Sequence, residues 1–283
     1  MIVFSRPNAN IFVPDARFSR SALARTTLMG VGAHQDDLEF MAYYPILKAF
    51  TDENEWFTGV VVTNGASSVR NGTYRNFTDE EMIELRRIEQ QEAAVIGKYA
   101  AAIQLDHTSA DVKDPANTSV VDDLEQILVH AKPREVYTHN LADKHDTHVG
   151  VVLKLIEAIR RLPLSAQPQK LVGCEVWRDL DWLCDKDKVV MDVSGHDELA
   201  DSLLAVFDSQ IAGGKRYDLA TRGRRLANAT YFESHATDKA AALIFGMDLT
   251  PLILDNNLEP EMLFERYLVA FRDEVKDRLK RLR

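Results

Sequence analysis

The chain has 283 residues, of which 46% are hydrophobic and 28% charged, so it is long and apolar enough to bury a sizeable core. A net charge of −10 argues against a nucleic-acid partner, because phosphate binding requires a basic face. The sequence has neither a signal-peptide pattern nor an apolar run near the ~20 residues of a membrane span, so we expect a cytoplasmic protein with no membrane partner.

Strands and helices alternate along the first half of the chain. Residues 1–25 are expected to form a lead-in segment, and the small apolar run 26–33 is typical of a buried parallel strand. A capping box of Thr78 and Glu81 predicts the start of a helix. Further strands are predicted at residues 56–63, 101–106 and 135–139, and helices at residues 37–50, 79–96, 119–131 and 147–161.

This alternation predicts βαβ units and a doubly wound α/β fold, with a mostly parallel, Rossmann-like sheet and helices on both faces. No repeat or linker divides the chain, so a single domain over residues 1–283 is expected, in which residues 170–283 shape the substrate site. Two cysteines are too few for a disulfide framework, and both are expected to be buried free thiols. The later strands are predicted at 170–177 and 188–193, the later helices at 198–207 and 260–282, and the cysteines are Cys174 and Cys184.

Four potential ligands or proton carriers follow the first buried strand, namely His34, Asp36, Asp37 and Glu39. Open α/β sheets place their active sites at this carboxyl end of the strands. Adjacent carboxylates repel each other, and their burial is costly unless a cation or protons compensate, so a bound metal ion is the favoured explanation. The alternative is a solvated helix N-terminus, which suits the carboxylates but gives His34 no role.

A second cluster of His and Asp follows the strand at 135–139, from His139 through Asp143 to His148. In a doubly wound sheet the first and fourth strands flank the crevice at the switch point, so the two clusters are expected to meet in one cleft. Taken alone, a histidine-rich loop is often a surface feature, and a structural role is favoured for His139. The convergence of two clusters far apart in sequence favours a metal-dependent active site.

These segments resemble the signature motifs of the LmbE-like (PIG-L) N-acetylglucosaminyl de-N-acetylases. That family has Ala-His-Pro-Asp-Asp-Glu after its first strand and His-Pro-Asp-His after its fourth, and residues 33–39 (AHQDDLE) and 145–148 (HDTH) are similar to them. The helical segment 86–97 is similar to an Arg- and Glu-rich helix of the family that ends in Gly, and 207–210 and 231–233 are similar to two later motifs. The resemblance extends from about residue 26 to about residue 236.

The resemblance implies the LmbE-like de-N-acetylase fold and one Zn²⁺ per chain. It also implies that His34, Asp37 and His148 are the zinc ligands, that Asp36 is the general base and that His145 is a second catalytic residue. The residue types suit these roles, because three protein ligands leave one position for water and zinc lowers the pKa of that water to roughly 7. Asp36 is then placed to take the water proton, and the activated water to attack an acetamide carbonyl.

Three positions depart from the family pattern. Gln35 stands in place of the proline and keeps the ligand spacing, and the acidic residue that closes the first motif is moved by one position. Thr147 stands where the family has an aspartate, so the task of orienting a neighbouring side chain is expected to pass to Asp146 or Asp143. None of the three changes removes an expected ligand.

Substrate contacts are expected from the loop 64–72 after the second strand, where the family has a substrate-binding arginine. Arg70 is the candidate for that arginine with Asn71 beside it, and Trp177 would supply an aromatic wall for a sugar. A mobile surface loop and a core role for the tryptophan are the alternatives. The sequence leaves open whether Arg216, Tyr217 and His235 approach the site, and whether Arg86 and Glu89 form a helix salt bridge or support Asp36 and Asp37.

The sequence therefore predicts a zinc-dependent hydrolase that removes the acetyl group from a small N-acetylated, sugar-like substrate of the N-acetylglucosamine type. A non-catalytic carbohydrate-binding relative and a zinc amidohydrolase acting on a non-sugar amide stay open, as does a homo-oligomeric state. A dinucleotide-binding Rossmann protein is disfavoured, because Gln35 replaces the third glycine of a Gly-x-Gly-x-x-Gly pattern and the two aspartates after it would repel a pyrophosphate.

Overall fold

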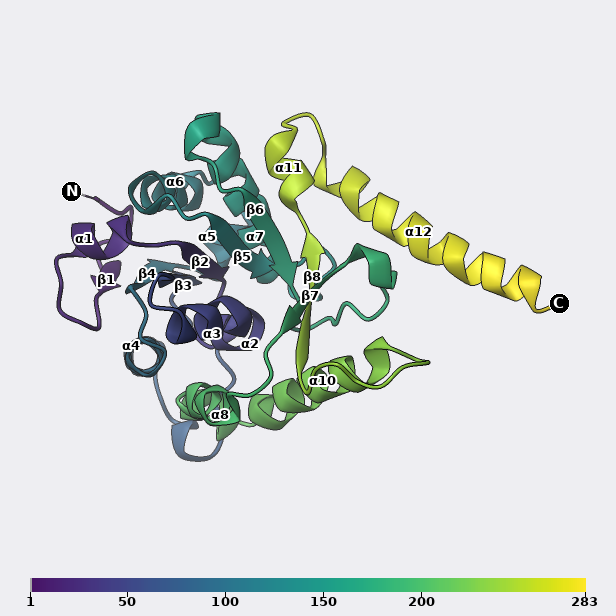
Figure 1. Ribbon diagram of the computed structural model, residues 1–283. Coiled ribbons are helices and arrows are strands. Elements are labelled where there is room, and N and C mark those ends of the chain that lie inside the picture. Colours follow the sequence, from purple (N-terminus) through teal and green to yellow (C-terminus); the bar gives the residue numbers. More distant parts are fainter. Residues whose placement is uncertain (1) are drawn as a thin grey trace.

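Short runs of small and β-branched residues form the centre of the sheet in the computed structural model, which describes residues 2–283 (Figure 1). β2 (Leu28–Gly32) and β3 (Phe57–Thr63) are buried along their whole length, as parallel strands are when helices cover both faces. The other strands are β1 (Asn10–Phe12), β4 (Ala101–His107), β5 (Glu135–His139), β6 (Lys170–Cys174), β7 (Lys188–Asp192) and β8 (Leu243–Asp248).

The strands form one sheet in the order β1-β4-β3-β2-β5-β6-β8-β7. The central strands β4, β3, β2, β5 and β6 are parallel, whereas β1 pairs antiparallel with β4, and β8 pairs antiparallel with both β6 and β7. The predicted α/β class with a mostly parallel sheet is confirmed. β2 and β5 are direct neighbours, with Met29 opposite Val136, so the segments that follow them leave the same edge of the sheet.

Helices cover both faces of this sheet, and each face has its own hydrophobic core (Figure 1). Met29 and Val31 of β2 enter one core and Leu28 enters the other, as the two-residue period of a strand requires. The first core is covered by α1 (Ser19–Ala24), α6 (Ser119–Ala131) and α7 (Asp146–Arg161), and the second by α2 (Asp37–Met41), α3 (Tyr43–Thr51), α4 (Asp79–Ile96) and α8 (Asp197–Ala205).

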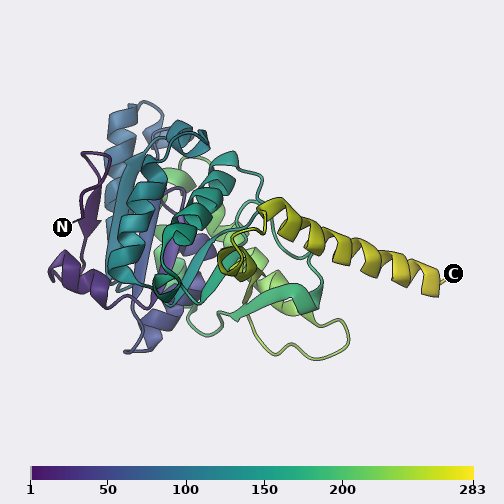
Figure 2. The same cartoon turned by 90° about the horizontal axis from the view of Figure 1, so that it is seen from above.

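The remaining helices are α5 (Ser109–Lys113), α9 (Asp208–Ile211), α10 (Tyr217–Phe232), α11 (Thr250–Leu254) and α12 (Pro260–Arg281). Figure 2 shows α12 extending away from the sheet and its covering helices. Among residues 2–283 there is no helix whose length and apolar content would let it cross a membrane. Cys174 and Cys184 are buried free thiols, as predicted.

Three predictions of local structure need correction. The lead-in segment is partly regular, because it supplies β1 at the edge of the sheet and α1. The helix predicted over 37–50 is two helices that meet at Ala42, since Pro45 has no N–H to donate to the carbonyl of Met41. α10 and β8 were not predicted, and α10 gives little apolar periodicity because two of its three buried residues, Arg225 and Asn228, are polar.

Candidate active site

The carboxyl ends of the parallel strands open onto one cavity of about 570 Å³. The segments after β2, β3 and β6 contribute side chains to its wall, and the start of α7 and one face of α10 complete it. His34 and Asp37 come from the segment after β2, and His145 comes from the segment after β5. The two clusters that are far apart in sequence therefore meet in one cleft, as expected for neighbouring strands.

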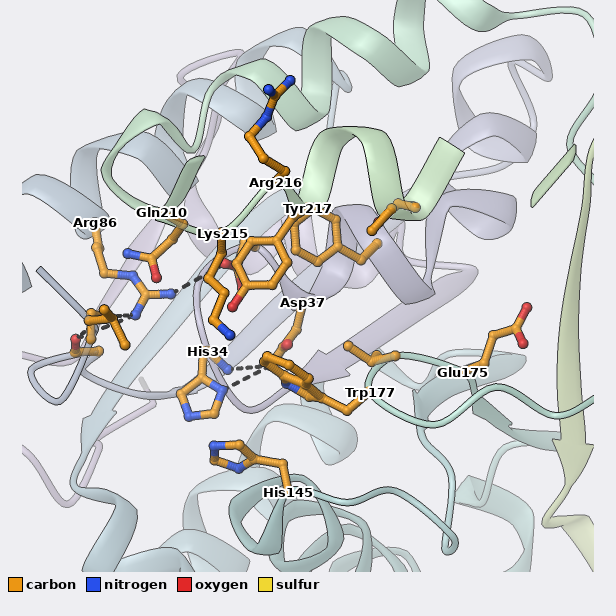
Figure 3. Close-up of a pocket in the computed structure, with 18 of the residues that line it drawn as sticks. His34, Asp37, Arg86, His145, Glu175, Trp177, Gln210, Lys215, Arg216 and Tyr217 are labelled. Carbon is orange, nitrogen blue, oxygen red and sulfur yellow. Dashed lines mark hydrogen bonds and ion pairs between the residues drawn. The ribbon is translucent and has the colours of Figure 1, made fainter. Parts of the chain in front are cut away.

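His34 and Asp37 line the cavity, and the buried His148 lies directly against both of them. Nδ1 of His34 lies 3.2 Å from Nε2 of His148, and the same His148 atom lies 3.4 Å from Oδ1 of Asp37. Oδ2 of Asp37 lies 3.3 Å from Nδ1 of His34 and accepts the backbone N–H of His34 at 2.7 Å. These contacts hold the carboxylate against both rings, and Figure 3 shows Asp37 beside His34.

The donor set of this cluster fits a zinc ion. Tetrahedral zinc with bonds of about 2.0–2.1 Å keeps its ligand atoms about 3.3 Å apart, and the ring nitrogens of His34 and His148 are 3.2 Å apart. One carboxylate oxygen of Asp37 lies 3.3 Å from the His34 nitrogen and the other lies 3.4 Å from the His148 nitrogen. Burial lowers the pKa of His148 to about 4, so its ring is neutral at pH 7 and has a lone pair to offer. Burial alone would raise the pKa of Asp37, but the imidazoles of His148 and His139 hold it well below its ordinary value.

His139 and Asp143 lie directly behind these residues. The His139 ring stacks on His148 with centroids 3.8 Å apart, and its Nε2 is 3.4 Å from Oδ2 of Asp37 and accepts the backbone N–H of Ala33 at 2.9 Å. Oδ2 of Asp143 lies 3.4 Å from Nδ1 of His148. Of the two carboxylates that the sequence left open for the orienting role, Asp143 is the one that lies beside the His148 ring.

Asp36 lies beside this cluster in a conformation that few non-glycine residues adopt. Its φ is 95° and its ψ is −33°, at the position just before α2. The backbone N–H is held by Oε1 of Gln90 at 3.3 Å, and the carboxylate is buried yet lines the cavity. Burial raises the pKa of Asp36 well above its ordinary value, and the Arg86 guanidinium, 3.6 Å away, opposes that shift.

The two helix residues Arg86 and Glu89 are buried and contact different partners. Nη2 of Arg86 donates to the carbonyl of Gln35 at 2.5 Å and faces the Asp36 carboxylate. Glu89 accepts both the backbone N–H of Ser209 at 2.8 Å and its hydroxyl at 2.6 Å. Of the two roles left open by the sequence, the structure favours support of Asp36 by Arg86 over a pair within the helix.

His145 stands at the edge of the cluster and faces the cavity (Figure 3). Its ring centroid is 5.0 Å from that of His34 and 4.7 Å from that of His148. The backbone N–H donates to Oδ1 of Asp143 at 2.9 Å. Burial and the nearby His34 lower the pKa of His145, so the ring is neutral at pH 7 unless a bound anion raises its pKa.

Of the three residues predicted to contact substrate, the structure places one at the cavity and two outside it. Trp177 lines the cavity and packs edge-to-face against Tyr217, with centroids 5.9 Å apart. Arg70 and Asn71 do not line it, which corrects the expectation from the loop position. The Arg70 guanidinium donates to the carbonyl of Ala66 at 2.6 Å and pairs with Asp79 at the start of α4, so it is turned away from the cavity.

Sequence reasoning missed two cations, Lys215 and Arg224, and a buried carboxylate, Glu175, that line the same cavity. Tyr217, which the sequence left undecided, also lines it, whereas His235 is exposed and does not. The only sequence signal for this wall was the Ser-Gln motif just before it, whose Gln210 also faces the cavity.

Comparison with known proteins agrees with this fold and motif pattern. Residues 29–159 match the family model of the PIG-L family, described as GlcNAc-PI de-N-acetylase. The predicted resemblance to the LmbE-like (PIG-L) family is therefore confirmed. No curated protein sequence matches the chain.

Solved structures share the fold at low identity. The conserved protein TT1542 from Thermus thermophilus is 18% identical with a TM-score of 0.62, over 79% of this chain and 94% of that one. The N,N′-diacetylchitobiose deacetylase of Pyrococcus horikoshii is 15% identical with a TM-score of 0.63, over 81% and 86%. GalB, the 4-carboxy-2-hydroxymuconate hydratase of Pseudomonas putida KT2440, is 15% identical with a TM-score of 0.61, over 79% and 96%. A deacetylase and a hydratase share this fold, so the reaction must be argued from the site.

Proposed function

We propose that the protein is a zinc-dependent hydrolase that removes the acetyl group from a small N-acetylated, sugar-like substrate. The observation that carries this proposal is the cluster of His34, Asp37 and the buried His148, of which His34 and Asp37 line a cavity together with the Asp36 carboxylate. The family model for a de-N-acetylase covers both ligand-bearing segments. The fold is compatible with this reaction, since the deacetylase from Pyrococcus horikoshii has the same fold.

His34, Asp37 and His148 would hold the zinc ion. When bound, zinc supplies a Lewis acid that polarises the acetamide carbonyl and makes water more acidic. Asp143 would orient the His148 ring, since its Oδ2 lies 3.4 Å from Nδ1 while Nε2 faces His34 and Asp37. The remaining ligand carboxylate, Asp37, is held by the His34 backbone N–H.

The reaction needs one proton removed from water and one delivered to the leaving nitrogen. Asp36 is placed to accept the water proton on its carboxylate, and the Arg86 guanidinium, 3.6 Å away, favours the charged form of that carboxylate against the effect of burial. The water oxygen bonds to the carbonyl carbon, the C–N bond breaks, and the products are acetate and an amine. His145 also lines the cavity, and its ring is placed to stabilise the oxyanion. The proton that Asp36 takes from water is the one the leaving nitrogen needs, and His145 is placed to pass it on to the amine.

Zinc content and acetate release from the purified protein test this proposal together. About one zinc per chain, with acetate release from N-acetylated sugars that stops on adding a chelator and returns with zinc, is the expected result. If the protein binds zinc but releases no acetate from sugars or from simple N-acetyl amides, the result favours a non-catalytic carbohydrate-binding relative. Acetate release from the simple amides and not from the sugars would instead identify a zinc amidohydrolase that acts on a non-sugar amide. Absence of zinc binding would contradict the proposal.

A further inference from the structure

One face of α10 forms a wall of the cavity. Tyr217, Ala220, Thr221 and Arg224 all line it, a spacing of three, four and seven residues that keeps them on one side of the helix. Tyr217 lies close enough to the Asp36 and Asp37 carboxylates that they help to raise its pKa. Arg224 follows Tyr217 by seven positions, which is about 10 Å along the helix axis. The cavity therefore extends well beyond the space that an acetamide group needs.

Lys215 points into this cavity from the loop before α10. Figure 3 shows its side chain directed toward His34, and its Nζ lies 5.2 Å from the centre of the Trp177 ring. The loop is fixed, since the Lys215 N–H donates to the carbonyl of Gln210 at 3.1 Å and a Cβ on Gly213 would lie 2.2 Å from the carbonyl oxygen of Ser209. No carboxylate between residues 2 and 283 lies within 4.0 Å of the Lys215 ammonium group.

Arg224 is the second cation on this wall without an ion pair among the described residues. Its Nη1 donates to the carbonyl of Val176, next to the Trp177 that Lys215 covers. Glu175 also lines this part of the cavity and attracts Arg224. Its oxygens, however, already accept the Asn228 amide at 2.5 Å and two backbone N–H groups at 3.1 Å, and burial raises its pKa.

Each of the other arginines at the cavity is bonded more fully than Arg224, with an ion pair or at least two hydrogen bonds. Arg86 is held by the Gln35 carbonyl and faces Asp36, and Arg225 donates to the carbonyls of Glu39 and Phe40. Arg216 pairs with Asp218 at 2.8 Å, and Figure 3 shows it directed away from His34 and Trp177. In a chain with a net charge of −10, Lys215 and Arg224 thus place two available positive charges beside the segment 176–177.

We propose that Lys215 and Arg224 bind an anionic group of the substrate, a carboxylate or a phosphate ester, beside the Trp177 ring. The inference rests on the proposed function and narrows its substrate class to N-acetylated compounds that carry a negative charge away from the acetamide. A charged hydrogen bond to each cation fixes the distal end of the substrate along α10. The acetamide of the same substrate then lies near His34 and Asp37, next to Tyr217 at the first turn of α10.

Binding to the zinc-loaded Asp36→Asn protein tests the inference without turnover. Three ligands are compared by calorimetry: N,N′-diacetylchitobiose as the neutral member, a disaccharide of N-acetylglucosamine and glucuronic acid for carboxylate, and N-acetylglucosamine 6-phosphate for phosphate. We expect at least one anionic ligand to bind about tenfold or more tightly than the neutral one, and that preference to shrink as salt is added. If only the glucuronic acid disaccharide binds more tightly, the site prefers a carboxylate, and if only the 6-phosphate does, it prefers a phosphate ester. Equal affinity for all three ligands would overturn the inference.

Two substitutions locate the effect. Lys215→Met and Arg224→Met are each expected to lower the ratio of anionic to neutral affinity about tenfold. The matched control is Arg222→Met, because Arg222 lies on the same helix, pairs with Asp201 at 2.9 Å and does not line the cavity. Retention of the anion preference in both variants, or an equal loss in the control, would overturn the assignment. If no sugar releases acetate from the unmodified enzyme, the proposed function fails, while these binding ratios still decide the inference.

Discussion

The Asp143 carboxylate lies against the His148 ring on the side away from His34. Its Oδ2 is 3.4 Å from Nδ1 of His148, whereas Nε2 of the same ring is 3.2 Å from Nδ1 of His34. One ring nitrogen thus lies beside a carboxylate while the other faces His34 and Asp37. From this position Asp143 is expected to take the orienting task inferred for the aspartate that the family has in place of Thr147.

Asp143→Asn is expected to weaken zinc affinity about 10–100-fold, because the His148 ring loses the charged partner that orients it and makes it more basic. Competition with a chromophoric chelator measures the change. Asp146→Asn is the control, since Asp146 is exposed at the start of α7. Equal zinc affinity of the Asp143 variant and the unmodified protein would exclude this orienting role.

His148→Ala and Asp37→Ala are each expected to abolish stoichiometric zinc binding, because either change leaves only two protein ligands. Metal analysis after dialysis gives the readout, and circular dichroism checks that the variants are folded. His235→Ala should bind zinc normally, because His235 is exposed and outside the cavity. A folded Asp37→Ala protein with one tightly held zinc would show that the ligand set is different.

Asp36→Asn is expected to keep its zinc and to lose about 10²–10⁴-fold in turnover, because the amide cannot accept a proton from water. Zinc content is measured on the same sample, so that loss of the metal is separated from loss of the base. Undiminished acetate release would remove Asp36 from the role of base.

Glu55 joins the segment before β3 to the segment before β5 through its ion pair with Arg134 at 2.7 Å, and Lys48 lies 3.3 Å away. Burial alone would raise the pKa of Glu55, but Thr27, Arg134 and Lys48 together lower it. A depressed carboxyl pKa stabilises the fold above the pKa of the unfolded chain, and the contribution is lost as pH falls through the folded value.

Glu55→Gln is therefore expected to reduce the free energy of unfolding by about 1 kcal/mol at pH 7 and by much less at pH 3. Urea denaturation at the two pH values measures the difference. Glu53→Gln is the matched control, because Glu53 is exposed and has no ion pair within the described part of the chain. A loss that is the same at both pH values would show that the Glu55 charge is not responsible.

The sequence allowed prediction of the sheet and of the ligand cluster for one shared reason. Buried parallel strands appear in the sequence as continuous apolar runs, so histidines at or just after the end of such a run, as His34 and His139 are, can be recognised as candidate site residues. The contacts of long polar side chains were not predictable in this way. Arg70 follows β3 as expected, but its guanidinium turns back to Asp79, and that turn depends on the path of the whole loop.

α10 was missed because a helix whose inner face is polar lacks the apolar period by which helices are found in a sequence. Its buried residues include Arg225 and Asn228, which bond to backbone carbonyls and to Glu175 rather than packing in an apolar core. The second wall of the cavity, and with it Lys215 and Arg224, is therefore visible only in the folded chain.

The backbone of Asp36 has a consequence for attempts to engineer this protein. A non-glycine residue at φ 95° carries strain of order 1–3 kcal/mol, and its carboxylate is also buried at a cost. Asp36→Gly relieves both, since glycine adopts positive φ without strain. A selection for heat resistance that ignores turnover is thus expected to enrich glycine at this position, yielding a more durable protein that no longer catalyses the reaction.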